Sequence, residues 1–218
     1  MTLNVFTASY KNIKNDRFND RLLSISEGKD NYSSECLPIF SPRKEFLDEW
    51  YSRKDRYSKE NIRFFISEYY KQILANLNPE EIANNLKNKI ILCHEGNAKF
   101  NPRYLVAAWL ELTLGREVPE IEVSSDGKVK KINRPPYIKD MLESIMKENL
   151  DMGKYHSIQA IFLFKKADQL DNYAIKAMDD DDSNYSLQLS FLAKEYRENA
   201  FRIEEEYVRE QKRLEKAI

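Results

Sequence analysis

Three residues that could carry chemistry lie side by side in the run Cys93-His94-Glu95. A cysteine next to a histidine suggests a nucleophile and its base. The run continues the apolar stretch 90–92, which is typical of a buried strand, and neighbouring side chains of a strand point to opposite faces. Cys93 and His94 are therefore not expected to pair. Cys93 and Glu95 share a face, but a carboxylate disfavours the thiolate form of a nearby cysteine.

We predict Glu95 as a general base or as the group that binds a ligand hydroxyl, because it ends the strand where ligands of α/β proteins usually bind. Cys93 is the second catalytic candidate. The plainer alternatives are that Cys93 is a small buried hydrophobic residue and that Glu95 is a loop carboxylate.

A helix is expected directly after this strand and its polar loop. Asn101 is its predicted N-cap, Pro102 its first residue and Gly115 the residue that ends it. Arg103 lies in the first turn, where the helix macrodipole disfavours a cation. Arg103 therefore needs an anionic partner, which is either a ligand phosphate or, in the plainer alternative, Glu95.

Polar residues also follow the first predicted strand, which spans residues 3–7. If this strand and the strand at residues 89–95 are neighbours, the polar residues of both gather at one edge of the sheet. We therefore predict a ligand-binding set at that edge, made of Ser9, Tyr10, Lys11, Asn101 and Arg103.

The composition excludes several classes of function. Among 218 residues, 35 are basic and 36 acidic, so charge alone gives no general affinity for nucleic acid. Two cysteines and two histidines are too few for a disulfide framework or a typical zinc site. Gly-rich dinucleotide and phosphate-binding motifs are also missing, so we predict neither a metal nor a cofactor. The chain has no signal-peptide core and no stretch of about 20 apolar residues, so we expect a cytoplasmic protein without a membrane partner.

The order of the predicted elements indicates an α/β domain. Strands are expected at 3–7, 21–26, 89–95 and 118–123, with a short return strand at 129–132, and three helices are expected between residues 41 and 88. This order predicts a Rossmann-like three-layer domain over residues 1–136. Residues 137–218 show only helical periodicity, which predicts an all-helical extension that folds as a hairpin.

A resemblance adds to this reading. The segments VFTASYKN, RLLSIS and IILCHEGNAKFNPRYLVAAWLE resemble the uncharacterised bacterial family called domain of unknown function 488, which implies a Rossmann-like fold with a pocket. The family's Cys-x-Glu motif is matched by Cys93 and Glu95, and Arg103 matches the last residue of its Cys-His-Arg motif. Asn101 and Pro102 stand where the family has Cys and His, so a reaction that uses that pair would be lost here. The C-terminal helices resemble the extension of phage and mobile-element relatives.

Three functions remain open at this point. The first is a pocket for a nucleotide or another phosphate-bearing molecule, in an enzyme or a degenerate enzyme. The second is a protein-interaction module that binds a partner or forms a homodimer through the C-terminal hairpin. The third is nucleic-acid binding by the basic segment of Lys128, Lys130, Lys131 and Arg134, for which a solvated hairpin face is the plainer explanation.

Overall fold

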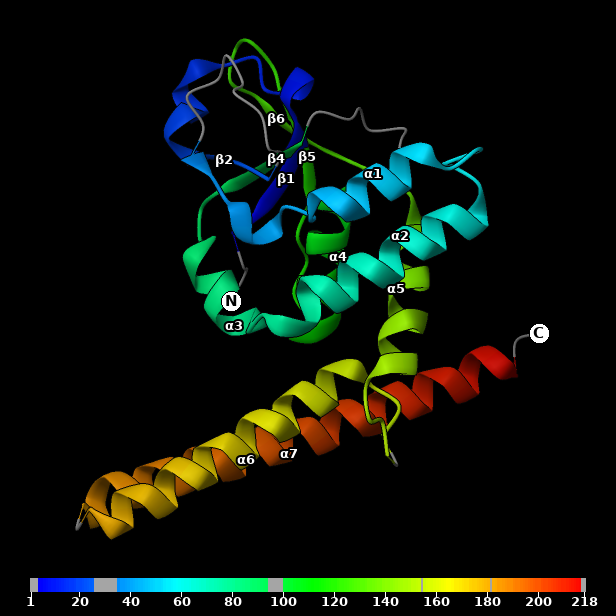
Figure 1. Ribbon diagram of the computed structural model, residues 1–218. Helices are drawn as coiled ribbons and strands as arrows, with labels where there is room; N and C mark the ends of the chain where they lie inside the picture. Colours follow the sequence, from blue (N-terminus) through cyan, green and yellow to red (C-terminus); the bar gives the residue numbers. More distant parts are fainter. Residues whose placement is uncertain (1–3, 26–34, 94–99, 154, 181, 217–218) are drawn as a thin grey trace. The chain divides into compact units, whose positions relative to one another are not determined.

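Six strands form one sheet in the order β3-β2-β4-β1-β5-β6 within the described part of the chain (Figure 1). The computed structural model describes residues 4–25, 35–93, 100–153, 155–180 and 182–216. Neighbouring strands are parallel except β5 and β6, which are antiparallel. The predicted α/β class and the helical C-terminal region are both confirmed. The strands are β1 (Phe6–Ser9), β2 (Leu22–Ser24), β3 (Glu35–Cys36), β4 (Ile90–Cys93), β5 (Glu120–Val123) and β6 (Val129–Ile132).

β1 and β4 are the central pair of the sheet. The condition for the predicted site is therefore met, because the first strand and the strand that ends at Cys93 are neighbours. All four residues of β4 are buried, as expected for a parallel strand that is covered on both faces. The first strand was predicted at residues 3–7 but lies at Phe6–Ser9. The prediction missed its end because pairing of Ala8 and Ser9 with β4, rather than their own strand propensity, keeps them extended.

One face of the sheet packs against the connection between β1 and β2. Tyr10, Ile13 and Phe18 of this connection pack with Ala8 and Leu92 in one hydrophobic cluster. The connection holds two short 3-10 helices, η1 (Tyr10–Asn12) and η2 (Asp16–Arg21), where a three-layer domain would have α-helices.

Local hydrogen bonds explain this difference. The side chains of Ser9 and Asn15 accept bonds from the backbone N–H groups of Lys11 and Arg17, two residues further on. Such bonds replace those of an α-helix, so the segment forms tight turns.

The other face of the sheet packs against α4 (Pro102–Leu114), whose predicted bounds are confirmed. Gly115 ends the helix with φ of 63°, the left-handed conformation that favours glycine. The buried residues of α4 occur on every side of the helix, and they include Arg103 and Thr113. A helix that is buried all round lies inside the domain rather than on its surface.

Three α-helices lie between β3 and β4: α1 (Lys44–Ser52), α2 (Lys59–Gln72) and α3 (Pro79–Asn85). Two 3-10 helices accompany them, η3 (Pro38–Phe40) and η4 (Leu74–Asn76). Ser58 caps α2 by accepting from the backbone N–H of Asn61, and Asn78 caps α3 by accepting from those of Glu80 and Glu81. Ser41 and Pro42 also suggest a helix start, but α1 begins only at Lys44.

Aromatic contacts hold α1 and α2 together and reach the start of α4. The ring centroids of Phe46 and Phe65 are 4.8 Å apart, and those of Trp50 and Phe65 are 5.0 Å apart. Phe100, just before α4, contacts Phe65 at 5.0 Å between ring centroids. This aromatic cluster therefore links the first turn of α4 to the helical layer.

The chain divides into two compact units, Met1–Glu148 and Asn149–Ile218. The predicted boundary after Pro136 differs from this division by the length of α5 (Pro136–Asn149). Ion pairs tie α5 to the first unit: Lys139 Nζ lies 3.3 Å from a carboxylate oxygen of Glu111, and Arg63 Nη2 lies 2.6 Å from one of Glu148.

The second unit is a helical hairpin of α6 (Ile158–Asp179) and α7 (Ser183–Glu215), which lie side by side (Figure 1). The seam between the two helices is made mostly of small residues. The seam consists of Ala167, Leu170, Ala174, Ala177, Leu189 and Ala193.

Within the described residues, no helix has the length and apolar character to cross a membrane.

Glu204 closes the base of the hairpin. Its carboxylate accepts hydrogen bonds from the backbone N–H groups of His156 at 2.7 Å and Ser157 at 2.9 Å. A carboxylate at the amino end of α6 is also favoured by the helix macrodipole.

The position of α5 gives a testable prediction. A fragment of residues 1–150 should fold, whereas a fragment of residues 1–136 should not. The shorter fragment lacks the buried side chains Ile138, Leu142, Ile145 and Met146. Each contributes about 1.5–3 kcal/mol of burial, so the loss approaches the roughly 5–15 kcal/mol by which whole domains are stable. Cooperative urea unfolding of both fragments, followed by circular dichroism, distinguishes the two boundaries; equal stability would contradict the assignment of α5 to the first unit.

Candidate functional site

Ser9 and Cys93 lie opposite each other at the carboxyl ends of β1 and β4. They are the last residues of their strands, and both are buried, with exposed fractions of 1% and 4%. Because side chains alternate along a strand, both point to the face that carries α4, opposite to Ala8 and Leu92. The structure therefore brings together one predicted ligand-binding residue and one predicted catalytic residue.

Tyr10 and Lys11 do not join them. Tyr10 is buried in the hydrophobic cluster on the opposite face of the sheet. Lys11 belongs to η1 and is exposed, and its backbone N–H donates to the hydroxyl of Ser9 at 3.3 Å. The turn of η1 therefore separates the Ser9 side chain from the two residues that follow it.

Glu95 and His94 lie outside the described residues, so the role of Glu95 stays a prediction. Near Cys93, Tyr69 of α2 is completely buried. Burial raises the pKa of Tyr69 well above its usual value, and the neighbouring Cys93 raises it further. The Tyr69 hydroxyl donates to the carbonyl oxygen of Phe40 at 2.8 Å. Tyr69 is thus a protonated phenol that cannot take a proton from Cys93.

Arg103 is completely buried and forms an ion pair with Glu120, the first residue of β5. Its Nη2 atom lies 3.0 Å from Oε1 of Glu120, and its Nε atom lies 3.2 and 3.3 Å from the two carboxylate oxygens. The sequence argument that Arg103 needs an anion was sound, but the anion is an internal carboxylate on β5. A direct role of Arg103 in ligand binding remains a prediction.

Two more side chains extend this ion pair into a buried polar network. Nη2 of Arg103 donates to the hydroxyl of Tyr104 at 3.2 Å, and the Asn101 side chain also bonds to Tyr104. Burial raises the pKa of Tyr104, and the charge of Arg103 partly opposes this. Asn101 occupies the predicted N-cap position of α4, but its side chain makes no capping hydrogen bond.

Sequence reasoning missed Glu120 and Tyr104 as members of the site. Glu120 belongs to a strand whose polar residues alternate with Ile121 and Val123, so a solvent-facing carboxylate was the natural reading. Glu120 is instead only 1% exposed. The sequence contained one indication of Glu120: Arg103 lacked an explained anionic partner, and a buried acid elsewhere in the domain could be that partner.

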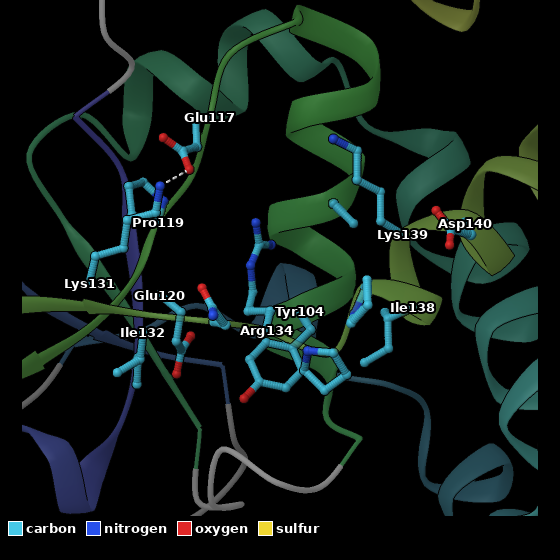
Figure 2. Close-up of a pocket in the computed structure, with 14 residues that line it drawn as sticks. Tyr104, Glu117, Pro119, Glu120, Lys131, Ile132, Arg134, Ile138, Lys139 and Asp140 are labelled. Atoms are coloured by element: carbon cyan, nitrogen blue, oxygen red, sulfur yellow. Dashed lines mark hydrogen bonds and ion pairs between the residues drawn. The ribbon is translucent and has the colours of Figure 1, made fainter. Parts of the chain in front are cut away.

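A cavity of ≈ 480 Å³ lies beside this network (Figure 2). Its walls come from α4, from the start of β5, from the end of β6 and from the first turn of α5, all within the first unit. Tyr104 and Glu120 line it, so Arg103 lies directly behind the wall. The cavity opens beside the beginning of β5, whereas the predicted site lies at the carboxyl ends of β1 and β4.

The basic segment around β6 is largely paired with acids. Lys128 bonds to Asp126 at 2.9 Å, Lys131 pairs with Glu117 (Figure 2), and Arg134 pairs with Glu111. This neutralisation favours the solvated hairpin over a nucleic-acid surface, which stays a prediction. Among the described residues, no group of three or more His, Cys, Asp or Glu side chains could hold a metal ion.

Comparison of the chain with models of known protein families, with curated proteins and with solved structures found no match. The resemblance to domain of unknown function 488 therefore depends on the short motifs of the sequence. The fold is compatible with it only at the level of an α/β sheet with helical additions.

The buried ion pair gives a second prediction. Arg103→Met should lower the free energy of unfolding by about 3–5 kcal/mol, because Glu120 is left as an uncompensated buried charge. The double variant Arg103→Met with Glu120→Leu should be more stable than Arg103→Met. Urea unfolding measures both.

A matched control is Arg63→Met, which removes an exposed ion pair with Glu148 and should cost about 1 kcal/mol or less. If Arg103→Met lowers the free energy of unfolding by no more than Arg63→Met does, the ion pair of Arg103 and Glu120 does not hold α4 to β5.

Proposed function

We propose that the first unit is a Rossmann-like binding module for a phosphate-bearing small molecule of the nucleotide type, with its site at the carboxyl ends of β1 and β4. One observation carries this proposal. β1 and β4 are neighbours, yet the chain after β1 packs on one face of the sheet and α4, the next element described after β4, packs on the other. Ligands of open α/β sheets bind where adjacent strands send their connections to opposite faces.

The groups at this position fit such a ligand. The hydroxyl of Ser9 lies at the end of β1, and the exposed Lys11 adds a positive charge on η1. α4 follows β4, so the positive end of its macrodipole is directed to this edge, which favours an anion. Asn101 and Arg103 fix the position of that helix end by their contacts with Tyr104 and Glu120. In this proposal they support the site in this way, and the guanidinium of Arg103 pairs with Glu120.

Catalysis is an open part of this proposal. Cys93 is the candidate for a reacting group among the described residues, and Tyr69 beside it is a protonated phenol. The simpler account is that Cys93 and Ser9 bind the ligand and that Glu95 binds a hydroxyl group of the ligand.

A thermal-shift screen against nucleoside phosphates, sugar phosphates and short oligonucleotides tests the proposal. A ligand of the native state should stabilise the protein by about 2.7 kcal/mol at 100 times its Kd. Ser9→Ala and Cys93→Ala should reduce the shift produced by the best ligand. Arg103 is a poor choice of variant, because its loss is expected to destabilise the fold itself.

The matched control is Cys36→Ala, which changes the exposed cysteine of the edge strand β3 and should leave the shift unchanged. If Ser9→Ala and Cys93→Ala bind the ligand as tightly as the unchanged protein, the site is elsewhere.

The second candidate function is association through the hairpin of α6 and α7. It is favoured by large apolar side chains that stay exposed near the turn, among them Ile175 at 59%, Leu187 at 57% and Phe191 at 63%. Leu187 and Phe191 are four residues apart on α7 and therefore share one face, whereas Leu189 and Ala193 are buried in the seam. An exposed apolar face of this kind commonly marks a contact with another protein.

Phe191→Glu should weaken any self-association or partner binding of the chain, because it places a charge on this apolar face. Gln188→Glu is the control, since it adds the same charge at an exposed polar position of α7. Light scattering after size-exclusion chromatography, over a range of protein concentrations, measures the molar mass. A mass of one chain at every concentration, for the unchanged protein, would contradict self-association.

A further inference from the structure

Five exposed residues of α7 form a stripe on the side of the helix away from the seam, which we call the outer stripe. Successive members are four or three residues apart in alternation, which is the spacing by which one helix packs along another. The first two lie two residues, or about 200°, before Leu189 and Ala193 of the seam, so the outer stripe lies opposite α6. Its members are Leu187, Phe191, Lys194, Glu198 and Phe201.

The apolar members of the outer stripe are half or more exposed. The exposed fraction is 57% for Leu187, 63% for Phe191 and 50% for Phe201. The ring of Phe201 also contacts the ring of Phe164 on α6, at 4.9 Å between centroids, and this contact holds Phe201 at the end of the stripe. The helix therefore has one face packed in the hairpin and a second apolar face in water.

Two opposite charges occupy the middle of the outer stripe. Lys194 and Glu198 lie 3.9 Å apart within one chain, and their side chains are 71% and 67% exposed. An exposed pair of this kind contributes little to the stability of its own helix. A partner that covers the stripe must place an acid opposite Lys194, a base opposite Glu198, and apolar side chains on either side of them.

The outer stripe of a second copy meets these requirements when the two α7 helices run antiparallel. A two-fold axis at the level of Tyr196 brings together residues that lie equally far before and after it. Lys194 then meets Glu198 of the second copy, and Phe191 meets Phe201 of the second copy. The axis repeats both contacts. A parallel pair would instead place Lys194 against Lys194, and like charges in an interface repel.

We infer that this chain forms an antiparallel homodimer through the outer stripe of α7, with Lys194 of each copy paired to Glu198 of the other. The inference rests on the second candidate function, association through the hairpin, and gives it one partner and one orientation. The charged pair fixes the register of the two helices, and the phenylalanines on both sides supply the apolar contact. The dimer does not depend on the site at β1 and β4.

Exchange of the two charges tests the inference in the full chain. Lys194→Glu alone places two acids opposite each other twice per dimer, and Glu198→Lys alone does the same with two bases. Each variant should raise the dissociation constant of its own homodimer at least about tenfold. An equimolar mixture of the two variants should dimerise again, because every charge then meets its opposite.

Light scattering after size-exclusion chromatography, over a range of protein concentrations, measures the molar mass of each sample. Lys165→Glu is the matched control, since it makes the same change at an exposed position of α6 and should leave the mass unchanged. Far-UV circular dichroism checks that both charge variants fold.

Three results would overturn the inference: a mass of one chain for the unchanged protein at every concentration, single variants that dimerise as tightly as the unchanged protein, or a mixture that stays monomeric. The first result would also remove self-association as a function of the hairpin. A dimer that ignores both charge variants but is lost in Phe191→Glu would keep self-association and reject the antiparallel arrangement, so the two failures can be told apart.

Discussion

The buried ion pair between Arg103 and Glu120 is the interaction on which the first unit depends. Both side chains are withdrawn from water, and a charge in that position is tolerated only with a well-oriented partner. The pair joins the first turn of α4 to the first residue of β5, so it fixes how the helix crosses the sheet. Tyr104 and Asn101 extend the same network along the start of the helix.

Polar contacts hold α4 near both of its ends. Arg103 binds Glu120 near its beginning, and Glu111 binds Arg134 and Lys139 near its end. The two anchors contact parts of the chain that follow α4 in sequence, and together they hold β5, β6 and α5 around it.

Much of the fold was predictable from local signals. Ser58, Asn78 and Gly115 mark helix ends by short-range chemistry, and the apolar run of β4 marks a buried parallel strand. The adjacency of β1 and β4 was only a condition of the predicted site; the structure meets this condition, which brings Ser9 and Cys93 together. What failed depends on contacts between distant residues: Glu120 as the partner of Arg103, the burial of Tyr10 on the opposite face, and the attachment of α5 to the first unit. No local sequence pattern predicts these contacts, because each depends on which elements cover the two faces of the completed sheet.

Hydrogen–deuterium exchange with and without the strongest ligand of the thermal-shift screen tests the central claim most directly. The account predicts slower exchange of backbone amides in residues 9–13 and 100–104, which flank the carboxyl ends of β1 and β4. Protection confined to residues 131–140, or to the hairpin of α6 and α7, would contradict it. In that case the ligand site would lie at the cavity beside β5 or on the helical unit instead.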